Sequence, residues 1–443
     1  MPKRFVLLFP FAAFLTIIIS SHTLSSVSGL TPASDNYSST FSSPASNSSL
    51  PFTQNETNNA SSSSFKITEQ LKSLLNERVD KNKTNAAIAI GLVNPNGIQF
   101  YGHGKLSREY DKTVDINSIF AIGSNTKVFT AILLADLVHK GLVKLDDPIE
   151  KYLPTNVKIP EYKGHKITLE NLATHTSALP EWPSNYCFGI PSHYPPNETI
   201  KYRLDTMNCG KNYTFNQLHQ ALSNTTLSRE PGSKFEYSTF GSALLGHILT
   251  LKSNMSSFDE LLANNILNVL GMDSTSFNPS DLQKSRLAVG HFNGRELPIW
   301  NLSKPLEPGG GLYSSIGDML KFLSANIGLI NTKLDNTLHE SHLIRHSTGL
   351  VLPNNLKATS NDNLGYYIGL GWIVTTNYGQ EIIWHNGATP GGYNAFMAFN
   401  PATERGVVIL TSADVANNNI AGLMFKSADH LSSLITGLLD NPH

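Results

Sequence analysis

The sequence contains little charge and no excess of either sign. Its 443 residues include 33 Lys and Arg against 34 Asp and Glu, so charged residues make up 15% and the net charge is −1. The average soluble domain contains roughly 25% charged residues. This balance gives no electrostatic indication of a nucleic-acid or anionic-membrane partner. Because apolar residues make up 40%, the chain can still build a large hydrophobic core.

Cysteine is almost absent, and the two that occur, Cys187 and Cys209, lie close together in the sequence. The segment between them is rich in Pro, Tyr and Asn and has no clear period. In an exported protein two such cysteines most simply pair. We therefore predict a Cys187–Cys209 disulfide that staples an irregular loop, with two unpaired thiols as the alternative.

The N-terminus resembles an export signal. Lys3 and Arg4 precede an apolar run from Phe5 to Ile19, and small and polar residues follow. The run is short for a transmembrane helix, which needs about 20 residues, and residues 1–28 fit a secretory signal peptide. The alternative is an uncleaved membrane anchor through residues 5–19. Either interpretation predicts a secreted protein or one on the extracytoplasmic cell surface.

Residues 29–64 contain 12 Ser, 4 Thr and 5 Asn, which predicts a flexible stalk because such a segment buries too little apolar surface to become ordered. Four Asn-x-Ser/Thr sequons within it fit a glycoprotein tether in a host that glycosylates Asn. The remaining residues, 65–443, form the predicted folded domain. The sequons are Asn36, Asn47, Asn55 and Asn59.

The folded part has helical and strand patterns that predict an α+β protein with three layers, α/β/α. We expect an antiparallel sheet from about 65–115 and 360–443, with a mainly helical lobe inserted at about 116–359. Asn94 to Gly97 is a hairpin signal. The expected strands are 86–93, 98–101, 369–375, 381–385, 393–399 and 405–411, and the expected helices are 65–79, 239–251, 258–270, 420–438 and one that begins around Ser124.

Three short motifs carry the candidate chemistry. The first is Ser124-Asn125-Thr126-Lys127, in which a helix start would bring the amine of Lys127 to the hydroxyl of Ser124. The pattern alone is weak, since residues 63–66 match it by chance. The second is Tyr237-Ser238-Thr239, and the third is His385-Asn386-Gly387 at the end of an expected strand.

Together these motifs resemble the serine β-lactamase and penicillin-binding protein superfamily, in particular the branch of class C β-lactamases, DD-carboxypeptidases, related esterases and D-aminopeptidases. The likeness covers most of residues 65–440. In that branch the second motif is Tyr-x-Asn and the third is Lys-Thr-Gly or His-x-Gly. Further segments that resemble the branch are 172–180 (LATHTSALP), 308–315 (PGGGLYSS), 369–372 (GLGW) and 391–393 (GGY).

The resemblance implies a role for each motif residue. Ser124 is the expected nucleophile, Lys127 its activating partner and Tyr237 the general base of acylation, with a phenolate favoured by Lys127. The amides of Ser124 and Ala388 are expected to form the oxyanion hole. Residues expected to bind substrate are Thr239, His385, Asn386 and Gly387.

Two motif positions depart from the family pattern. Thr239 lacks the carboxamide of Tyr-x-Asn, and His385 replaces a permanently charged lysine. We expect a protonated His385 to help bind a substrate carboxylate. Both departures argue against an efficient class C β-lactamase.

The resemblance implies an exported serine hydrolase that forms an acyl-enzyme on a small or peptide amide, ester or β-lactam, without a cofactor. We expect a D-Ala-D-Ala carboxypeptidase-like enzyme or a D-amino-acid peptidase. The alternatives are a class C-type β-lactamase, a carboxylesterase, or a catalytically weak binding or scaffold protein on the same fold.

Three other interpretations of the sequence are disfavoured. His339, His342 and His346 lack the spacing of a metal motif, so we expect a polar surface segment and no metal. The sequence contains no Gly-x-Ser-x-Gly elbow, which disfavours an α/β-hydrolase. His175 is expected to be a buried hydrogen-bonding residue, and Trp372 and Trp384 to lie in the core.

Overall fold

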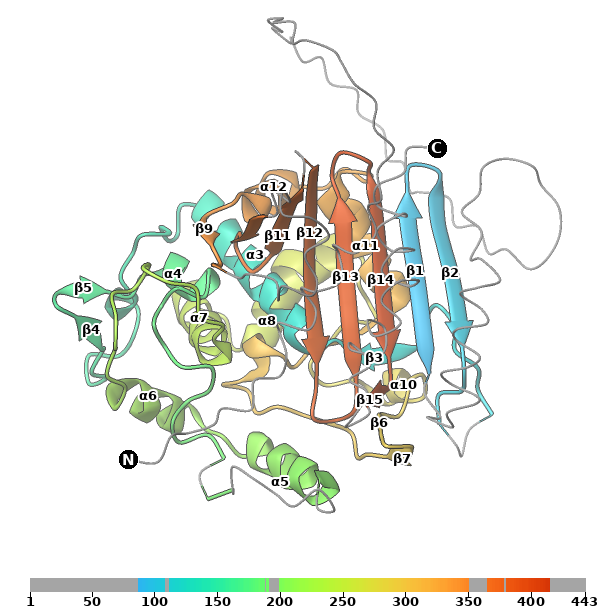
Figure 1. Ribbon diagram of the computed structural model, residues 1–443, viewed down its shortest axis with the longest axis horizontal. Helices are drawn as coiled ribbons and strands as arrows, with labels where there is room; N and C mark the ends of the chain where they lie inside the picture. The colour runs from blue at the N-terminus through green and yellow to red at the C-terminus, as the bar shows by residue number, and fades with distance from the viewer. Residues whose placement is uncertain are drawn as a thin grey trace, which may run out of the picture.

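The computed structural model describes residues 87–107, 111–187, 189–190, 199–349, 365–377 and 380–414. Its main feature is an antiparallel sheet of eight strands, ordered β2-β1-β14-β13-β12-β11-β10-β9 (Figure 1). The strands are β1 (Ile88–Asn94), β2 (Gly97–His103), β9 (His346–Ser347), β10 (Gly365–Ile368), β11 (Ile373–Asn377), β12 (Gln380–Ala388), β13 (Asn394–Asn400) and β14 (Arg405–Thr411).

The sheet joins the two ends of the folded part, as the sequence predicts. β1 pairs with β14, and Ile88 lies opposite Thr411. The predicted hairpin connects β1 to β2, where Asn94 pairs with Gly97, and Gly97 takes a φ of 124° that favours glycine. The edge strand β9 comes from residues that we assigned to the helical lobe, which corrects that boundary.

One predicted strand begins too early. Residues 369–372 form a turn, closed by a hydrogen bond from the Gly369 amide to the Trp372 carbonyl (2.8 Å), and β11 begins only at Ile373. Gly371 has a φ of 75°, and a Cβ there would lie 3.1 Å from the carbonyl oxygen of Lys127. Gly371 therefore serves a close approach to the helix that carries Lys127, not an extended strand.

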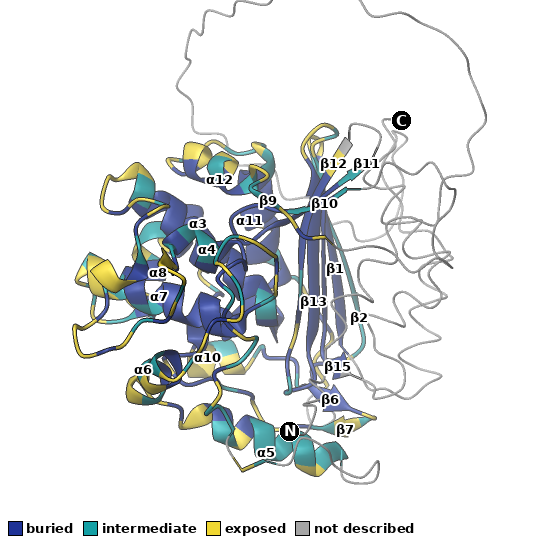
Figure 2. Cartoon of the chain, turned by 60° about the vertical axis from the view of Figure 1, so that its left-hand side comes forward, coloured by how far each residue is buried: buried dark blue, intermediate teal, exposed yellow. Residues whose placement is uncertain are grey.

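Helices cover one face of the sheet (Figure 2). They are α3 (Thr126–His139), α11 (Ile316–Ile327) and α12 (Asp335–His342). Phe129 of α3 stacks on Phe322 of α11 with 4.2 Å between ring centroids, and Trp372 lies against Phe322. Trp372 and Trp384 are fully buried, so both belong to the core, as predicted. The helices expected at 65–79 and 420–438 lie outside the described residues.

The lobe between the two parts of the sheet is mainly helical. The predicted helix 258–270 is interrupted by the π-helical turn η5 (Ala263–Leu267), in which Asn265 bonds the Leu261 carbonyl through its side chain. Apolar spacing does not distinguish this turn from a regular helix. The lobe's helices are α4 (Leu169–Ala173), α5 (Thr199–Lys211), α6 (Phe215–Ser223), α7 (Thr239–Ser253), α8 (Phe258–Leu262), α9 (Asn268–Leu270) and α10 (Asp281–Lys284).

Small sheets and 3₁₀ turns complete the lobe. β3 (Ile119–Ala121) pairs with β8 (Tyr313–Ser315), which fixes the chain just before Ser124. The other elements are β4 (Glu161–Tyr162), β5 (His165–Lys166), β6 (His291–Phe292), β7 (Arg295–Glu296), β15 (Ala413–Asp414), η2 (Gly123–Asn125), η3 (Ile149–Lys151) and η6 (Glu307–Gly309).

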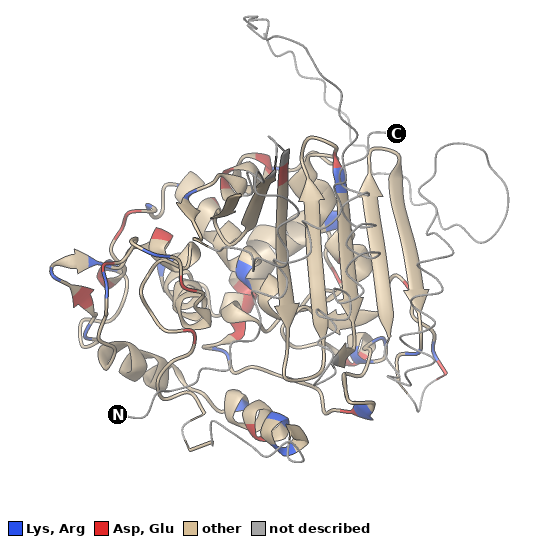
Figure 3. Cartoon of the chain, viewed as in Figure 1, with Lys and Arg blue, Asp and Glu red and all other residues tan. Residues whose placement is uncertain are grey.

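Acidic and basic residues are scattered along the ribbon of the described chain, over the lobe and the ends of the sheet (Figure 3). No helix in the described ranges is long and apolar enough to cross a bilayer.

Candidate active site

Ser124 lies in the 3₁₀ turn η2, immediately before α3. The Ile122 amide donates to the Leu312 carbonyl (2.9 Å), and the Thr126 hydroxyl donates to the Gly123 carbonyl (2.7 Å). Gly123 takes a φ of 53°, and a Cβ there would lie 2.8 Å from the Ala388 carbonyl oxygen. These bonds hold the hydroxyl of Ser124 at a half-buried turn where helix, lobe and sheet meet.

Lys127 reaches back to Ser124 from the first turn of α3. Its Nζ lies 3.1 Å from Oγ of Ser124 and donates to the carbonyl oxygen of Gly309. The side chain is buried, and this desolvation lowers the pKa of Lys127 from 10.5 to about 7, although the charge of Glu181 opposes the shift. A large fraction of Lys127 is therefore a neutral amine at neutral pH, able to accept a proton.

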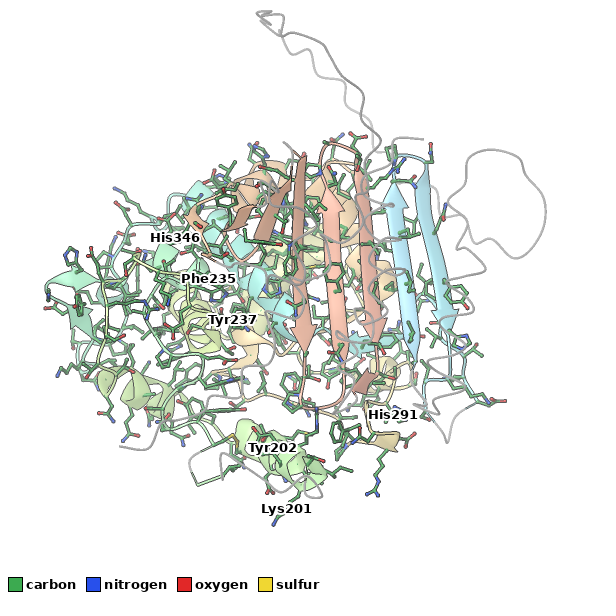
Figure 4. All side chains as sticks on the ribbon, viewed as in Figure 1. Lys201, Tyr202, Phe235, Tyr237, His291 and His346 are labelled. Atoms are coloured by element: carbon green, nitrogen blue, oxygen red, sulfur yellow. A yellow bond between two sulfur atoms is a disulfide. The ribbon has the colours of Figure 1, made fainter. Side chains whose placement is uncertain are left out.

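Tyr237, labelled in Figure 4, lies in the lobe just before α7. Nζ of Lys127 lies 4.8 Å from the centre of its ring, and its side chain hydrogen-bonds that of Ser124. Burial raises the pKa of Tyr237 above the ordinary value, and the bond to Ser124 only partly opposes this. The predicted phenolate is therefore not supported, because Tyr237 keeps its proton in the resting site.

The third motif ends β12 beside the nucleophile turn. A Cβ at Gly387 would lie 2.0 Å from the Ile122 carbonyl oxygen and 2.9 Å from the Ser124 amide nitrogen. A Cβ at Gly123 would lie 2.9 Å from the Ala388 nitrogen. Only glycine permits this approach, which brings the Ser124 and Ala388 backbones together as an oxyanion hole requires.

His385 and Asn386 lie on the same strand. His385 is buried, and its Nδ1 lies 2.6 Å from the Asn386 carbonyl oxygen. Burial lowers the pKa of His385 to about 3, and the nearby charge of Lys127 adds to the shift. His385 is therefore neutral at neutral pH, which corrects our expectation that a protonated His385 binds a substrate carboxylate. Asn386 is only half-buried.

The lobe positions the second motif through His175 and Ser238. The Ser238 amide donates to Nδ1 of His175 (3.1 Å), and His175 is buried, which confirms that it is a structural hydrogen-bonding residue. Thr239 begins α7 and is 3% exposed. A Cβ at Gly309 would lie 2.8 Å from the methyl carbon of Thr239. The Thr239 side chain therefore packs against the backbone at Gly309.

Cys187 and Cys209 form the predicted disulfide, with 5.3 Å between their Cα atoms. Cys209 lies on α5, the helix that carries the labelled residues Lys201 and Tyr202 in Figure 4. Arg203, also on α5, donates to the carbonyl oxygen of Pro390 (3.2 Å). The stapled segment thus touches the loop that follows Ala388.

The three histidines that raised the question of a metal do not converge. Nε2 of His342 pairs with Oδ1 of Asn326 (2.8 Å), and Nε2 of His346 lies 2.9 Å from the Gly232 carbonyl oxygen. In the part of the chain that the structure describes, no three His, Cys, Asp or Glu residues are arranged to hold a metal ion.

Two residues of the site were missed from the sequence. The Gly309 carbonyl accepts a bond from Lys127, although the surrounding PGGGLYSS segment was recognised. Glu181 follows the LATHTSALP segment, and its charge acts on Lys127 and Tyr237. Its place directly after a recognised segment is the only signal that could have indicated it.

Comparisons at the sequence level find related proteins. The sequence model of the family described as Beta-lactamase matches residues 71–422. The D-alanyl-D-alanine-carboxypeptidase/endopeptidase AmpH of Escherichia coli (strain K12) is 28% identical over 364 residues, which cover 80% of this chain and 85% of AmpH. Protein flp of Staphylococcus aureus (strain COL) is 25% identical over a region that covers 78% of this chain and 62% of the length of Protein flp.

Solved structures show the same fold. A β-lactamase/D-alanine carboxypeptidase from Yersinia pestis, complexed with citrate, superimposes with a TM-score of 0.63 at 22% identity, over 84% of this chain and 99% of that one. A class C β-lactamase from Rhodobacter sphaeroides has the same TM-score at 19% identity, over 82% and 99%.

Proposed function

The chain belongs to the β-lactamase family and is thus a serine acyl-transfer hydrolase, and from this premise we propose that it cleaves D-amino-acid peptides through an acyl-enzyme on Ser124. The observation that carries this proposal is the cluster of Ser124, Lys127 and Tyr237 against the backbone of Gly387 and Ala388. D-alanyl peptides are the substrates that the name of the AmpH relative states for that protein.

In the proposed acylation, Oγ of Ser124 attacks the acyl carbon and passes its proton to the neutral amine of Lys127. The 3.1 Å separation of the two atoms and the lowered pKa of Lys127 support this direction of transfer. The negative charge that forms on the acyl oxygen is stabilised by the amides of Ser124 and Ala388.

The leaving nitrogen needs a proton as the acyl bond breaks. We assign this step to the neutral phenol of Tyr237, which gives its proton to the leaving group and regains one from the Lys127 ammonium. Deacylation reverses the relay: water loses a proton toward Tyr237 and Lys127 and attacks the acyl carbon, and Ser124 regains its hydrogen.

The neutral state of His385 favours one alternative substrate class. A site whose third motif carries no cation has no charge there for a carboxylate, so neutral amides and esters fit it as well as carboxylate-terminated peptides do. Carboxylesterase activity is therefore the second candidate. A class C-type β-lactamase is less favoured, because the carboxamide of its second motif is replaced by the buried Thr239.

The cellular location remains a proposal from the sequence. We propose that residues 1–28 direct export, with a retained anchor through residues 5–19 as the alternative, and that residues 29–64 form a glycosylated stalk. These segments lie outside the described residues, but the Cys187–Cys209 disulfide fits an oxidising compartment.

A substrate panel tests the proposal. Wild-type protein and Ser124→Ala are compared on a D-Ala-D-Ala-terminated peptide, a p-nitrophenyl ester and a chromogenic cephalosporin. We expect Ser124-dependent hydrolysis of the peptide above that of the cephalosporin. Turnover of the ester alone would identify the esterase, and no turnover of any substrate would favour the binding or scaffold protein.

A further inference from the structure

Two histidines on separate helices of the lobe face each other outside the candidate active site. Nε2 of His219 on α6 lies 3.0 Å from Nε2 of His247 on α7. The ring centroids are 5.0 Å apart, so the Nε2 corners are the parts of the two rings that meet. None of the steps proposed for Ser124, Lys127 and Tyr237 uses either imidazole.

The backbone that carries the pair is held firmly on both helices. α6 begins with a capping box, and Leu218, the neighbour of His219, is fully buried. On α7 the neighbour of His247 is Gly246, where a Cβ would lie 2.3 Å from the Pro308 side chain, so α7 packs closely at this point. The two imidazoles are therefore presented from rigid supports, and a ligand between them would need to order little of the chain.

The surroundings of the pair suit a cation that prefers imidazole ligands. Both histidines are half-buried, so part of each ring remains open to solvent. The Phe215 ring covers His247, with 4.5 Å between centroids. Burial lowers the pKa of both imidazoles, that of His247 to about 4. At neutral pH both rings are thus in the neutral form that a metal ligand requires.

The separation of the two nitrogens matches that of neighbouring ligands on one metal ion. Metal–nitrogen bonds of about 2.0–2.1 Å, at ligand angles of about 90° to 110°, place the nitrogens about 2.9–3.4 Å apart, and the observed distance is 3.0 Å. In the hydrogen-bonded pair one Nε2 donates to the lone pair of the other. A bound metal uses both lone pairs, so the donor ring moves its proton from Nε2 to Nδ1, and the protein loses no proton.

We infer that His219 and His247 bind a divalent transition-metal ion, Zn²⁺ or Cu²⁺, as neighbouring ligands through their Nε2 atoms. Imidazole nitrogen is a ligand that both ions favour, and water completes the coordination. The site has two protein ligands, so it differs from the clusters of three or more that the described chain lacks. The ion would join α6 to α7 and stabilise the lobe without a part in the reaction at Ser124.

Metal titration of the full chain, stripped of metal with a chelator, tests the inference. Isothermal calorimetry with Zn²⁺ should show one saturable site, and Zn²⁺ should raise Tm because the ion binds the folded state. The electron paramagnetic resonance and electron spin echo spectra of the Cu²⁺ complex count the coordinated imidazoles, and we expect two. The sequence contains 15 His, so variants must assign the site.

The variants His219→Gln and His247→Gln keep a polar side chain but remove the imidazole. Each should weaken Zn²⁺ binding by about ten-fold or more and abolish the rise of Tm. His165→Gln is the matched control, because His165 is an exposed histidine that lies beside Glu230. It should bind Zn²⁺ as wild type does. Circular dichroism and fluorophosphonate labelling of Ser124 verify that every variant is folded.

Three results would overturn the inference. The first is the absence of saturable Zn²⁺ binding by wild type. The second is wild-type affinity in either His219→Gln or His247→Gln, which would show that the ion binds elsewhere on the chain. The third is a Cu²⁺ spectrum with a single coordinated imidazole, a result obtained on wild type and therefore independent of how well the variants fold.

Discussion

Nζ of Lys127 lies 3.1 Å from Oγ of Ser124 and also donates to the Gly309 carbonyl. The bond to the Gly309 carbonyl fixes the position of the amine, and the bond to Oγ directs the amine at the Ser124 hydroxyl. Because this arrangement is buried, the pKa of Lys127 falls to about 7. The same burial raises the pKa of Tyr237, which is why we propose the lysine amine, and not a phenolate, as the base of acylation.

The first prediction concerns the pH dependence of acylation. If neutral Lys127 accepts the Ser124 proton, kcat/KM rises as pH increases through about 7 and falls about ten-fold per pH unit below it. Lys127→Arg should abolish this limb and lower acylation by about 10²–10⁴-fold, because a guanidinium stays protonated. Stopped-flow acylation rates from pH 5 to 9 measure both effects.

Lys140→Arg is the control for that prediction, because Lys140 lies just beyond α3 and its exposed side chain pairs with the buried Asp136. It should keep the wild-type profile. A pH-independent rate in wild type, or a normal rate in Lys127→Arg, would exclude Lys127 as the base.

The second prediction concerns His385. Since its pKa lies near 3, its charge does not change between pH 5 and 8, and it confers no preference for carboxylates there. A D-Ala-D-Ala peptide and its C-terminal amide should therefore keep a constant ratio of kcat/KM over this range. A ratio that falls for the free acid as pH passes about 6.5 would show instead that His385 titrates in the site.

The third prediction concerns the contact between β12 and the nucleophile turn. Gly387→Ala places a Cβ about where the Ile122 carbonyl lies, so the strand must move away from Ser124. We expect kcat to fall by about 10²–10³-fold, the usual effect of losing one oxyanion donor, with little change in the circular dichroism spectrum.

Gly317→Ala on α11 is the comparison variant, since its Cβ would meet its nearest neighbour, Ile116, at 3.3 Å. It should retain wild-type activity. Activity in Gly387→Ala equal to that of Gly317→Ala would contradict the assignment of the Ala388 amide.

The fourth prediction concerns the disulfide. Its cysteines are 22 positions apart, and a loop of this length corresponds to roughly 3 kcal/mol in the entropic account. Replacing Cys187 and Cys209 by Ser should increase hydrogen exchange in α5 much more than in β13 and β14. An equal increase throughout the sheet would mean that the bridge stabilises the whole fold and not the stapled segment.

Much of the fold was predictable, because its signals are local. The β14 bounds coincide with the predicted run 405–411, and a helix follows Ser124 as expected, extending from Thr126 to His139. Local patterns failed where tertiary contacts decide the backbone. The turn at 369–372 exists because glycine lets the chain approach α3, and strand propensity contains no information about that neighbour.

The site was predictable in its residues but not in its protonation. Motif order and family resemblance indicated Ser124, Lys127 and Tyr237, and the structure brings them together. The charge states depend on burial by segments remote in sequence, so neither the neutral His385 nor the protonated Tyr237 could be inferred from their motifs. Glu181 was missed for a related reason, because its effect on Lys127 is visible only when the lobe is folded against α3.

The central claim is that Ser124 forms the acyl-enzyme, and covalent labelling measured by intact-protein mass spectrometry tests it most directly. We predict a single adduct after treatment with a fluorophosphonate or a fluorescent penicillin, mapped by peptide sequencing to Ser124 and absent from Ser124→Ala. An adduct on any other residue, or undiminished labelling of Ser124→Ala, would contradict the account.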